Sequence, residues 1–343
     1  MRIIYLFLCT FIAVNVHSQT LSGTVYDENK QTIPGASVYL DGTSIGTITD
    51  DNGHYKLTVA NKINTILVVS FIGYESYLVQ NPFENPTLKI QLVPKMTNLK
   101  EVTIVIDGFS RNDKLKIFRN QFLGTTKGGK SCKILNEDDI SFQYDLKKNK
   151  LTATSQNPLR IENKHLGYEV SFNLIDFNIE FFRKSIKVSD VVSSYFAGTT
   201  AYKDISNNNS TFVSRRKKSY EGSQMLFFRN LMRNIWDKKQ FELYNGSYPA
   251  NPNDYFLISQ TDGRYNITVK PNVAVKKNQL APAGFYSTFN LMYNRKAQSK
   301  VIFRIADFTV DAFGNTDAPD AIMFAGEMSK YRVGDLLPLD FPG

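Results

Sequence analysis

The stretch IPGASVYLDGTSIGTITDDNGHYKLTV, residues 33–59, decides the fold of the first unit of this chain. Residues 36–41 and 54–59 alternate apolar and polar side chains, which is typical of strands with one buried face. Pro34-Gly35 suits a type II turn, and Asn52-Gly53 supplies residues that tolerate a positive φ. The stretch therefore predicts short strands joined by tight turns.

The same pattern extends on both sides of this stretch. Residues 66–72 are almost continuously apolar, as expected of a central strand that is buried on both faces. Residues 88–92 alternate again, and Pro94 ends the run. Turn signals recur about every ten residues, so residues 19–94 are predicted to form an antiparallel β-sandwich.

Ordered motifs in this region carry a family resemblance. They are Gly23-Thr24-Val25, residues 33–38, Gly42-Thr43, residues 46–50 and residues 53–57. Together they resemble the carboxypeptidase regulatory-like domain, a transthyretin-like sandwich of exported bacterial proteins. The resemblance implies an accessory domain without a zinc site. A zinc peptidase needs several His and carboxylate ligands, and the only histidines after residue 18 are His54 and His165.

The N-terminus has the pattern of a secretory signal peptide over residues 1–18. Arg2 precedes an apolar run from Ile3 to Val16, and small residues precede a cleavage site after Ser18. The run is shorter than the roughly 20 residues that span a bilayer. Export to the periplasm, the outer membrane or the cell surface is expected.

Cysteine content and charge constrain the exported chain further. Cys9 lies in the predicted signal and leaves Cys132 alone, so no internal disulfide is expected and hydrophobic cores must supply the stability. The formal charge is +9, which suits an anionic envelope surface or glycan and, in this compartment, not nucleic acid. Peripheral association with the outer membrane follows as an expectation.

Residues 95–113 read as a connector with one further strand expected at 101–106, and residues 114–343 as a β-rich α+β domain. Leu115, Phe118 and Phe122 share one helix face, with Gly124 placed to end the helix. A second helix is predicted from Tyr220 to about Trp236. Strands are predicted at residues 132–135, 140–144, 151–155, 169–182, 255–259, 265–269 and 300–310.

This second region resembles the C-terminal half of exported bacterial proteins that begin with the regulatory-like domain, an architecture that implies no activity. The motifs include residues 122–124, 132–136, 158–168 and 220–223. Large outer-membrane nutrient receptors also begin with this domain, followed by a segment like residues 99–104. The rest of this chain is too short for the barrel of such a receptor. If the chain is related to these receptors, we expect it to be a truncated relative.

Two motifs match catalytic signatures by letter only. Residues 124–131 fit GxxxxGK[ST], but a helix precedes this loop and a strand follows it, the reverse of a phosphate-binding loop. A flexible basic loop without nucleotide binding is predicted instead. Residues 42–46 fit GxSxG around Ser44, yet they lie between two predicted strands, where a nucleophile elbow needs a strand-to-helix turn.

Other candidates have simpler structural explanations. Asp50, Asp51 and Asn52 are weak calcium candidates, because they lack the spacing of an EF-hand loop and suit a turn. Trp236 is predicted to lie in a core, and residues 215–218 to be a solvated basic run. Cys132 is expected to be a buried thiol and His165 a turn residue.

These patterns favour a non-enzymatic cell-envelope protein that binds or scaffolds an unknown envelope protein or glycan. No catalytic residue, cofactor or nucleotide is predicted. A glycan-directed hydrolase remains an alternative, with a carboxylate site built from Glu162, Asp176 or Glu221. A truncated relative of an outer-membrane nutrient receptor is the second alternative.

Overall fold

The computed structural model describes residues 19–343 except residues 61, 96–106, 208, 262 and 273–286. The predicted signal peptide and the strand expected at 101–106 lie outside the described residues. The chain is mainly β, and three separate hydrophobic cores hold it together. No described helix is both long and apolar enough to cross a membrane.

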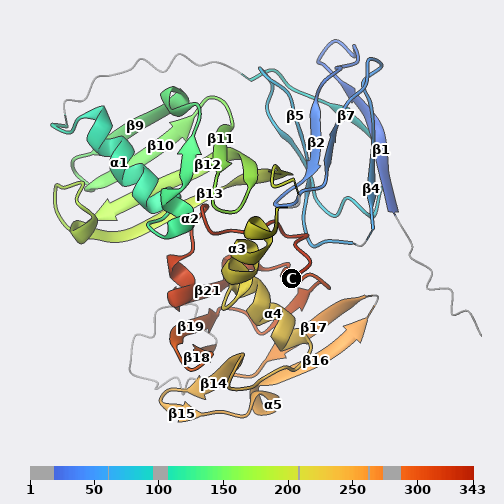
Figure 1. Ribbon diagram of the computed structural model, residues 1–343. Helices are drawn as coiled ribbons and strands as arrows, with labels where there is room; N and C mark the ends of the chain where they lie inside the picture. The colour runs from blue at the N-terminus through green and yellow to red at the C-terminus, as the bar shows by residue number, and fades with distance from the viewer. Residues whose placement is uncertain (1–18, 61, 96–106, 208, 262, 273–286) are drawn as a thin grey trace, which may run out of the picture.

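The first unit, residues 19–94 and hereafter the sandwich, packs two small sheets face to face (Figure 1). One sheet has the order β4-β1-β7 and the other β3-β2-β5-β6. The strands are β1 (Gln19–Tyr26), β2 (Ser37–Leu40), β3 (Gly46–Ile48), β4 (His54–Val59), β5 (Leu67–Ser70), β6 (Tyr77–Val79) and β7 (Thr87–Gln91). Alternating residues of both sheets fill the core, as the sequence pattern predicts.

Two details of the sandwich differ from the prediction. β1 pairs with β7 in parallel, so the sandwich is not antiparallel throughout. The continuous apolar run also forms a shorter strand than expected. Leu67, Val68 and Val69 of β5 are fully buried, whereas Ile72 lies beyond the strand and is 85% exposed. The apolar run therefore did not reveal where β5 stops pairing with β2.

The second unit, residues 107–204 and hereafter the middle unit, places helix α1 (Arg111–Phe122) across a six-stranded sheet (Figure 1). Phe118 and Phe122 of α1 pack on Phe172 and Phe177 of the sheet. The remaining elements are α2 (Lys127–Lys130), β8 (Cys132–Ile134), β9 (Ile140–Asp145), β10 (Lys150–Ser155), β11 (Leu159–Asn163), β12 (Tyr168–Phe181) and β13 (Val191–Asp204).

The helix and strands predicted for this unit are present, but not every strand was predicted. Leu123 is the C-cap of α1 and Gly124 follows with φ +94°, as predicted for a residue that ends a helix. The strand predicted at 169–182 is the single strand β12, with a register shift between Leu174 and Asp176. The long partner strand β13 has an irregular polar pattern and was not predicted.

The third unit, residues 210–330 and hereafter the C-terminal unit, joins three α-helices to two sheets around a core of its own. Its helices are α3 (Ser210–Tyr220), α4 (Gln224–Met232) and α5 (Pro252–Tyr255). Its sheets have the orders β15-β14-β18-β19-β21 and β16-β17-β20. The strands are β14 (Phe241–Asn245), β15 (Tyr248–Pro249), β16 (Phe256–Thr261), β17 (Arg264–Val269), β18 (Ser287–Tyr293), β19 (Ala297–Phe303), β20 (Asp307–Val310) and β21 (Ile322–Gly326).

The helix predicted from Tyr220 to Trp236 is wrong at both ends. α3 ends at Tyr220, Gly222 has φ +71°, and the Ser223 side chain accepts the hydrogen bond that starts α4. A residue with positive φ cannot continue a right-handed helix, so the chain turns between two helices. The strand predicted at 300–310 is likewise two strands, β19 and β20.

Residues 331–343, hereafter the tail, run back across all three units. The N–H groups of Val333 and Gly334 donate to the carbonyls of Phe122 and Leu123 in the middle unit. The N–H of Leu339 donates to Gly42 of the sandwich at 2.7 Å. The tail therefore joins segments that lie far apart in sequence.

Candidate functional site

Asp50, Asp51 and Asn52 form an exposed turn ahead of β4. The Asp50 carboxylate accepts hydrogen bonds from the N–H groups of Asn52 and His54, at 2.9 and 2.8 Å. This is the turn geometry that the sequence predicts for these residues. Among the described residues no cluster of three or more His, Cys, Asp and Glu side chains is arranged to hold a metal ion. Calcium binding at this turn stays a prediction.

Ser44 of the GxSxG motif contacts a carboxylate of the tail. Its hydroxyl donates to Asp340 Oδ2 at 2.5 Å, and its N–H donates to Oδ1 at 2.9 Å. Gly42 on the same loop has φ +74° and accepts from the tail. The motif connects β2 and β3, without a following helix, and its serine holds the sandwich to the tail.

The glycine-rich motif at 124–131 forms helix α2, so the predicted flexible loop is wrong. Thr126 caps this helix through its side chain. A Cβ on Gly128 would lie 2.4 Å from the Gly334 carbonyl oxygen, and one on Gly129 would lie 2.4 Å from that of Gly124. The glycines therefore permit close backbone packing. The order of helix, motif and strand is the one predicted from the sequence.

The carboxylates proposed for a hydrolase are not brought into one site. Glu162 on β11 pairs across the sheet with Glu169, and Asp176 lies seven residues farther along β12. At about 3.3 Å per residue, that is roughly 20 Å. Glycosidase carboxylates lie roughly 5–10 Å apart. Glu221 follows α3 in another unit, and none of these three side chains lines the cavity described below.

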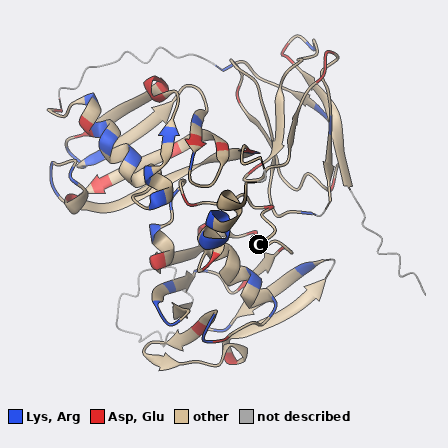
Figure 2. Cartoon of the chain, viewed as in Figure 1, with Lys and Arg blue, Asp and Glu red and all other residues tan. Residues whose placement is uncertain are grey.

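The basic run 215–218 lies inside α3, which is coloured blue there (Figure 2), and one of its residues is buried. Arg216 is 7% exposed and donates to both carboxylate oxygens of Asp204, at 2.7 and 2.9 Å. Its guanidinium lies 3.8 Å from the centre of the Tyr168 ring. The interpretation as a wholly solvated run is therefore wrong at Arg216.

Two single-residue predictions are confirmed, and a third holds only in part. Trp236 packs on the core of the C-terminal unit and stacks on Phe256, with ring centres 6.0 Å apart. Cys132 lies in β8 and is partly buried, not fully buried as predicted, and this burial raises the pKa of its thiol to about 12. His165 lies in the turn between β11 and β12.

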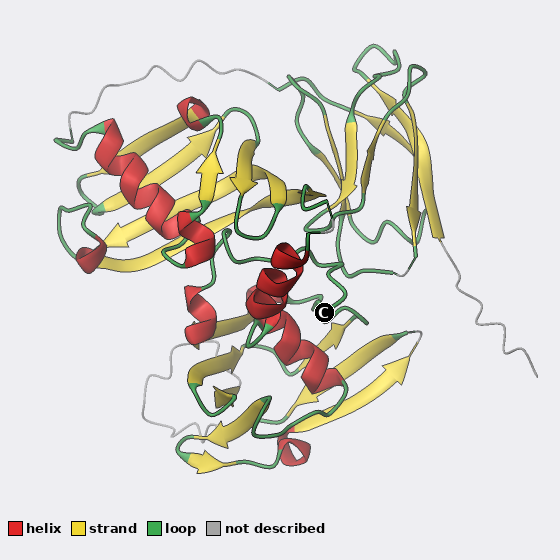
Figure 3. Ribbon diagram, in the orientation of Figure 1, coloured by secondary structure: helices red, strands yellow, loops and turns green. Residues whose placement is uncertain are grey.

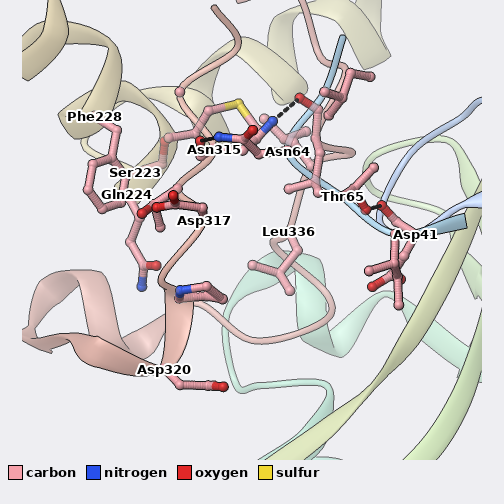
Figure 4. Close-up of a pocket in the computed structure, with 18 of the residues that line it drawn as sticks. Asp41, Asn64, Thr65, Ser223, Gln224, Phe228, Asn315, Asp317, Asp320 and Leu336 are labelled. Atoms are coloured by element: carbon pink, nitrogen blue, oxygen red, sulfur yellow. Dashed lines mark hydrogen bonds between the residues drawn. The ribbon is translucent and has the colours of Figure 1, made fainter. Parts of the chain in front are cut away.

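A cavity of about 710 Å³ lies where the sandwich, the C-terminal unit and the tail meet. The sandwich contributes Asp41 and residues 63–66 and 80–83. Helix ends around Ser223, the turn at 314–320 and tail residues complete the lining. Figure 4 shows Asp41 of the sandwich on one side, Gln224 and Phe228 of α4 on the other, and Leu336 of the tail between them.

A hydrogen-bonded network builds one wall of this cavity. The N–H of Asn64 donates to Asp311 Oδ2 at 2.8 Å, and its side-chain amide donates to the Asn315 carbonyl at 3.1 Å. The Asn315 amide donates to Asp311 and to the Leu339 carbonyl, each at 3.1 Å. This wall fixes three segments of the chain against one another.

Two partly buried carboxylates on the lining have altered acidity. Burial raises the pKa of Asp41 above its ordinary value, although the N–H of Thr200 donates to it at 2.6 Å. Burial also raises the pKa of Asp335, which accepts a hydrogen bond from the Thr126 hydroxyl. Both carboxylates are bonded to the protein, so their first role is to hold the junction.

Other polar groups of the lining are free to meet a ligand. The side chains of Gln224, Arg264 and Asp320 make no hydrogen bond or ion pair within the described residues, and each lines the cavity. They offer an amide, a cation and a carboxylate beside the apolar Phe228 and Leu336. This set suits a polar, uncharged or mixed-charge ligand such as a glycan or a short peptide.

The sequence did not reveal this cavity. Its residues come from seven separate stretches of the chain, from Asp41 to Leu339. The sandwich residues of the lining lie between its strands, and the start of α4 is the longest helical part of the lining. The motif DAFGNTD at 311–317 contains residues that favour turns, and it is a local signal of the turn at 314–320 that the sequence analysis missed.

Comparison with known proteins identifies the first unit. Residues 21–104 match the family of CarboxypepD_reg-like domains. The chain is 32% identical over 105 residues to TonB-dependent receptor P39 and 34% identical over 105 residues to TonB-dependent receptor P26, both of Formosa agariphila. It is 40% identical over 67 residues to TonB-dependent receptor SusC of Bacteroides thetaiotaomicron.

These likenesses cover a small part of each protein. They span 30%, 31% and 19% of this chain and 10%, 10% and 6% of the three receptors, respectively. The resemblance drawn from the sequence motifs is confirmed for the sandwich. The relationship to these receptors is one of a shared domain.

Proposed function

Residues 21–104 match the family of CarboxypepD_reg-like domains, and on this premise we propose that the chain is a non-enzymatic binding or scaffolding protein of the bacterial cell envelope. It acts in the periplasm or at the outer membrane, where its relatives that share this domain are receptors. The cavity between the sandwich, the C-terminal unit and the tail is its ligand site.

One observation carries this proposal: the accessory domain is built into the cavity wall. Asn64 and Asp41 of the sandwich are bonded to the C-terminal unit and the middle unit, so the sandwich is held in place. A domain fixed in this way gives the cavity a defined shape, and a preformed cavity binds without an ordering cost.

The free groups on the lining point to a glycan or short peptide of the envelope. Gln224 and Asp320 are exposed, so their replacement removes ligand contacts without disturbing a core. We expect Gln224→Ala and Asp320→Asn each to weaken binding about tenfold, the usual cost of leaving a bound polar group unpaired. Asp138→Asn, on the far side of the middle unit, is the control.

The test is calorimetric titration of the full chain with purified peptidoglycan fragments and with lipopolysaccharide core oligosaccharides. Binding by wild type and the Asp138→Asn variant, with loss in the two cavity variants, supports the proposal. Equal binding by all four proteins would place the ligand elsewhere. No binding of either glycan class or of envelope peptides would reject the cavity as a ligand site.

A second candidate function is favoured by the three receptor relatives. As a truncated relative of an outer-membrane nutrient receptor, the chain would keep the receptor's N-terminal domain and act beside such receptors as a scaffold. A photo-crosslinking residue in place of the exposed Ile48 should then capture an outer-membrane receptor in cells. If the same photo-crosslinking residue placed in α5 captured the same receptor, the receptor would contact the chain without a specific role for the sandwich.

A further inference from the structure

Strand β13 forms a long edge of the six-stranded sheet in the middle unit. It spans 14 residues and pairs with β12 along nearly its whole length. Figure 3 shows this sheet beside the sandwich, which meets the C-terminal end of β13. An edge strand leaves one row of backbone N–H and C=O groups without a partner in its own sheet.

A turn of the sandwich already pairs with part of this edge through its backbone. Thr43 forms a parallel bridge with Ala201. The N–H of Gly42 donates to the Thr200 carbonyl at 2.7 Å, and the N–H of Tyr202 donates to the Thr43 carbonyl at 2.9 Å. The backbone of Thr200 and Tyr202 therefore faces away from β12.

The open part of the edge continues directly from this contact. Backbone groups alternate in direction along a strand, so Ser194, Phe196 and Gly198 face outward like Thr200 and Tyr202. Within the described residues, no strand other than β12 pairs with β13 between residues 191 and 198. Three consecutive outward positions are thus left for another chain.

This edge lacks the features that normally prevent unwanted pairing. Residues 191–202 contain no Lys, Arg, Asp, Glu or Pro, although 21% of the whole chain is charged. Charged residues and proline are the common means of protecting an edge strand. Val192 and Tyr195 are instead 66% and 50% exposed. The edge has the composition of a strand that pairs.

An unpaired cation lies beside the open edge. Arg332 of the tail donates from Nη2 to the Ser194 hydroxyl at 3.1 Å, and its guanidinium carbon lies 5.9 Å from the centre of the Phe196 ring. No carboxylate forms an ion pair with Arg332 in the described part of the chain. Burial lowers the pKa of its guanidinium, which is the effect of a desolvated cation without a counter-charge.

We propose that residues 192–198 of β13 bind an extended peptide segment of an envelope partner by strand addition, with a carboxylate of that segment opposite Arg332. Main-chain hydrogen bonds supply the affinity and the ion pair fixes the register. Two copies paired edge to edge would bring two Arg332 side chains and two +9 chains together, so a second copy fits less well than an acidic peptide.

The test uses fluorescein-labelled, capped octapeptides that alternate threonine and valine, with one central glutamate. A matched peptide has glutamine in place of glutamate, and a third has N-methyl groups on alternate residues. Fluorescence anisotropy gives affinity to the full chain, and hydrogen exchange reports on the amides of residues 192–198. We expect binding of the glutamate peptide, about tenfold weaker binding of the glutamine peptide, and none of the methylated one.

The variants separate the ion pair from the backbone contact. Arg332→Gln should abolish the preference for glutamate, and Arg332→Lys should restore part of it. Arg160→Gln, which removes an exposed charge on β11, should leave the preference unchanged. Equal binding of the methylated peptide, no binding of any peptide, or a dimer that protects residues 192–198 would each overturn the proposal. The cavity variants do not affect this test.

Discussion

Arg216 holds a turn of the middle unit to helix α3. Besides Asp204 and Tyr168, its guanidinium contacts the carbonyls of Leu166 and Gly167, at 2.7 and 2.9 Å. Those carbonyls belong to the tight turn between β11 and β12. One cation thus satisfies buried backbone acceptors that water cannot reach.

Replacing Arg216 with alanine should lower the free energy of unfolding by about 2–3 kcal/mol, because two buried carbonyls and one carboxylate lose their partner. Urea denaturation measures the change. Lys217→Ala, at an exposed position of the same helix, should cost less than about 0.5 kcal/mol. Equal effects of the two variants would show that burial of Arg216 contributes nothing.

The same contact predicts a pH dependence. The hydrogen bonds from Arg216 hold the pKa of Asp204 below its ordinary value in the folded state. A carboxylate with a depressed folded-state pKa contributes stability above the unfolded-state pKa of about 4 and loses it as the pH falls further. The difference between wild type and Arg216→Ala should therefore shrink as denaturation is measured below pH 4.

At the scale of elements, helix α2 shows how a motif is used for packing. Its buried Gly128 faces Gly334 of the tail, and the Thr126 hydroxyl donates to Asp335 of the same segment. The element is only four residues long, so its own helix propensity cannot sustain it. Contact with the tail makes it ordered.

Gly128→Ala should destabilise the protein by about 2–3 kcal/mol, because the new methyl group would overlap the Gly334 carbonyl and must push the tail away. Thermal and urea denaturation check this. Lys130→Ala, on an exposed position of the same helix, should change stability by less than about 0.5 kcal/mol. A Gly128→Ala variant with unchanged stability would contradict the close packing and would favour the flexible loop that the sequence predicts.

At the scale of the whole molecule, the tail acts as a clamp. It bonds to Phe122 of the middle unit, to Gly42 and Ser44 of the sandwich, and, through Phe341, to Arg229 of the C-terminal unit. Three separate cores thereby share one fixed arrangement, and the cavity depends on it.

Removal of residues 331–343 should lower the melting temperature by at least about 5 °C and enlarge the radius of gyration, since sandwich and C-terminal unit lose their shared contact. Calorimetry and small-angle scattering measure both. Removal of only Pro342 and Gly343, which are exposed, should have little effect. A truncated protein that keeps its compact shape would show that the direct contacts between units suffice.

Sequence periodicity determined the elements that bury one face. The alternation at 54–59 specified β4, and the spacing of Leu115, Phe118 and Phe122 specified α1, because local burial patterns repeat with the period of the element. The sandwich family also followed from ordered turn motifs, since glycines with positive φ are fixed by local geometry.

Only the tertiary structure decided the rest. The burial of Arg216, the order of α2, the free edge of β13 and the cavity each depend on contacts between residues that are distant in sequence. Such contacts leave no local period, because the partner of Gly128 is Gly334 and that of Asn64 is Asp311. The sequence shows which faces of the elements are apolar. The packing of the whole molecule decides which of these faces contact one another.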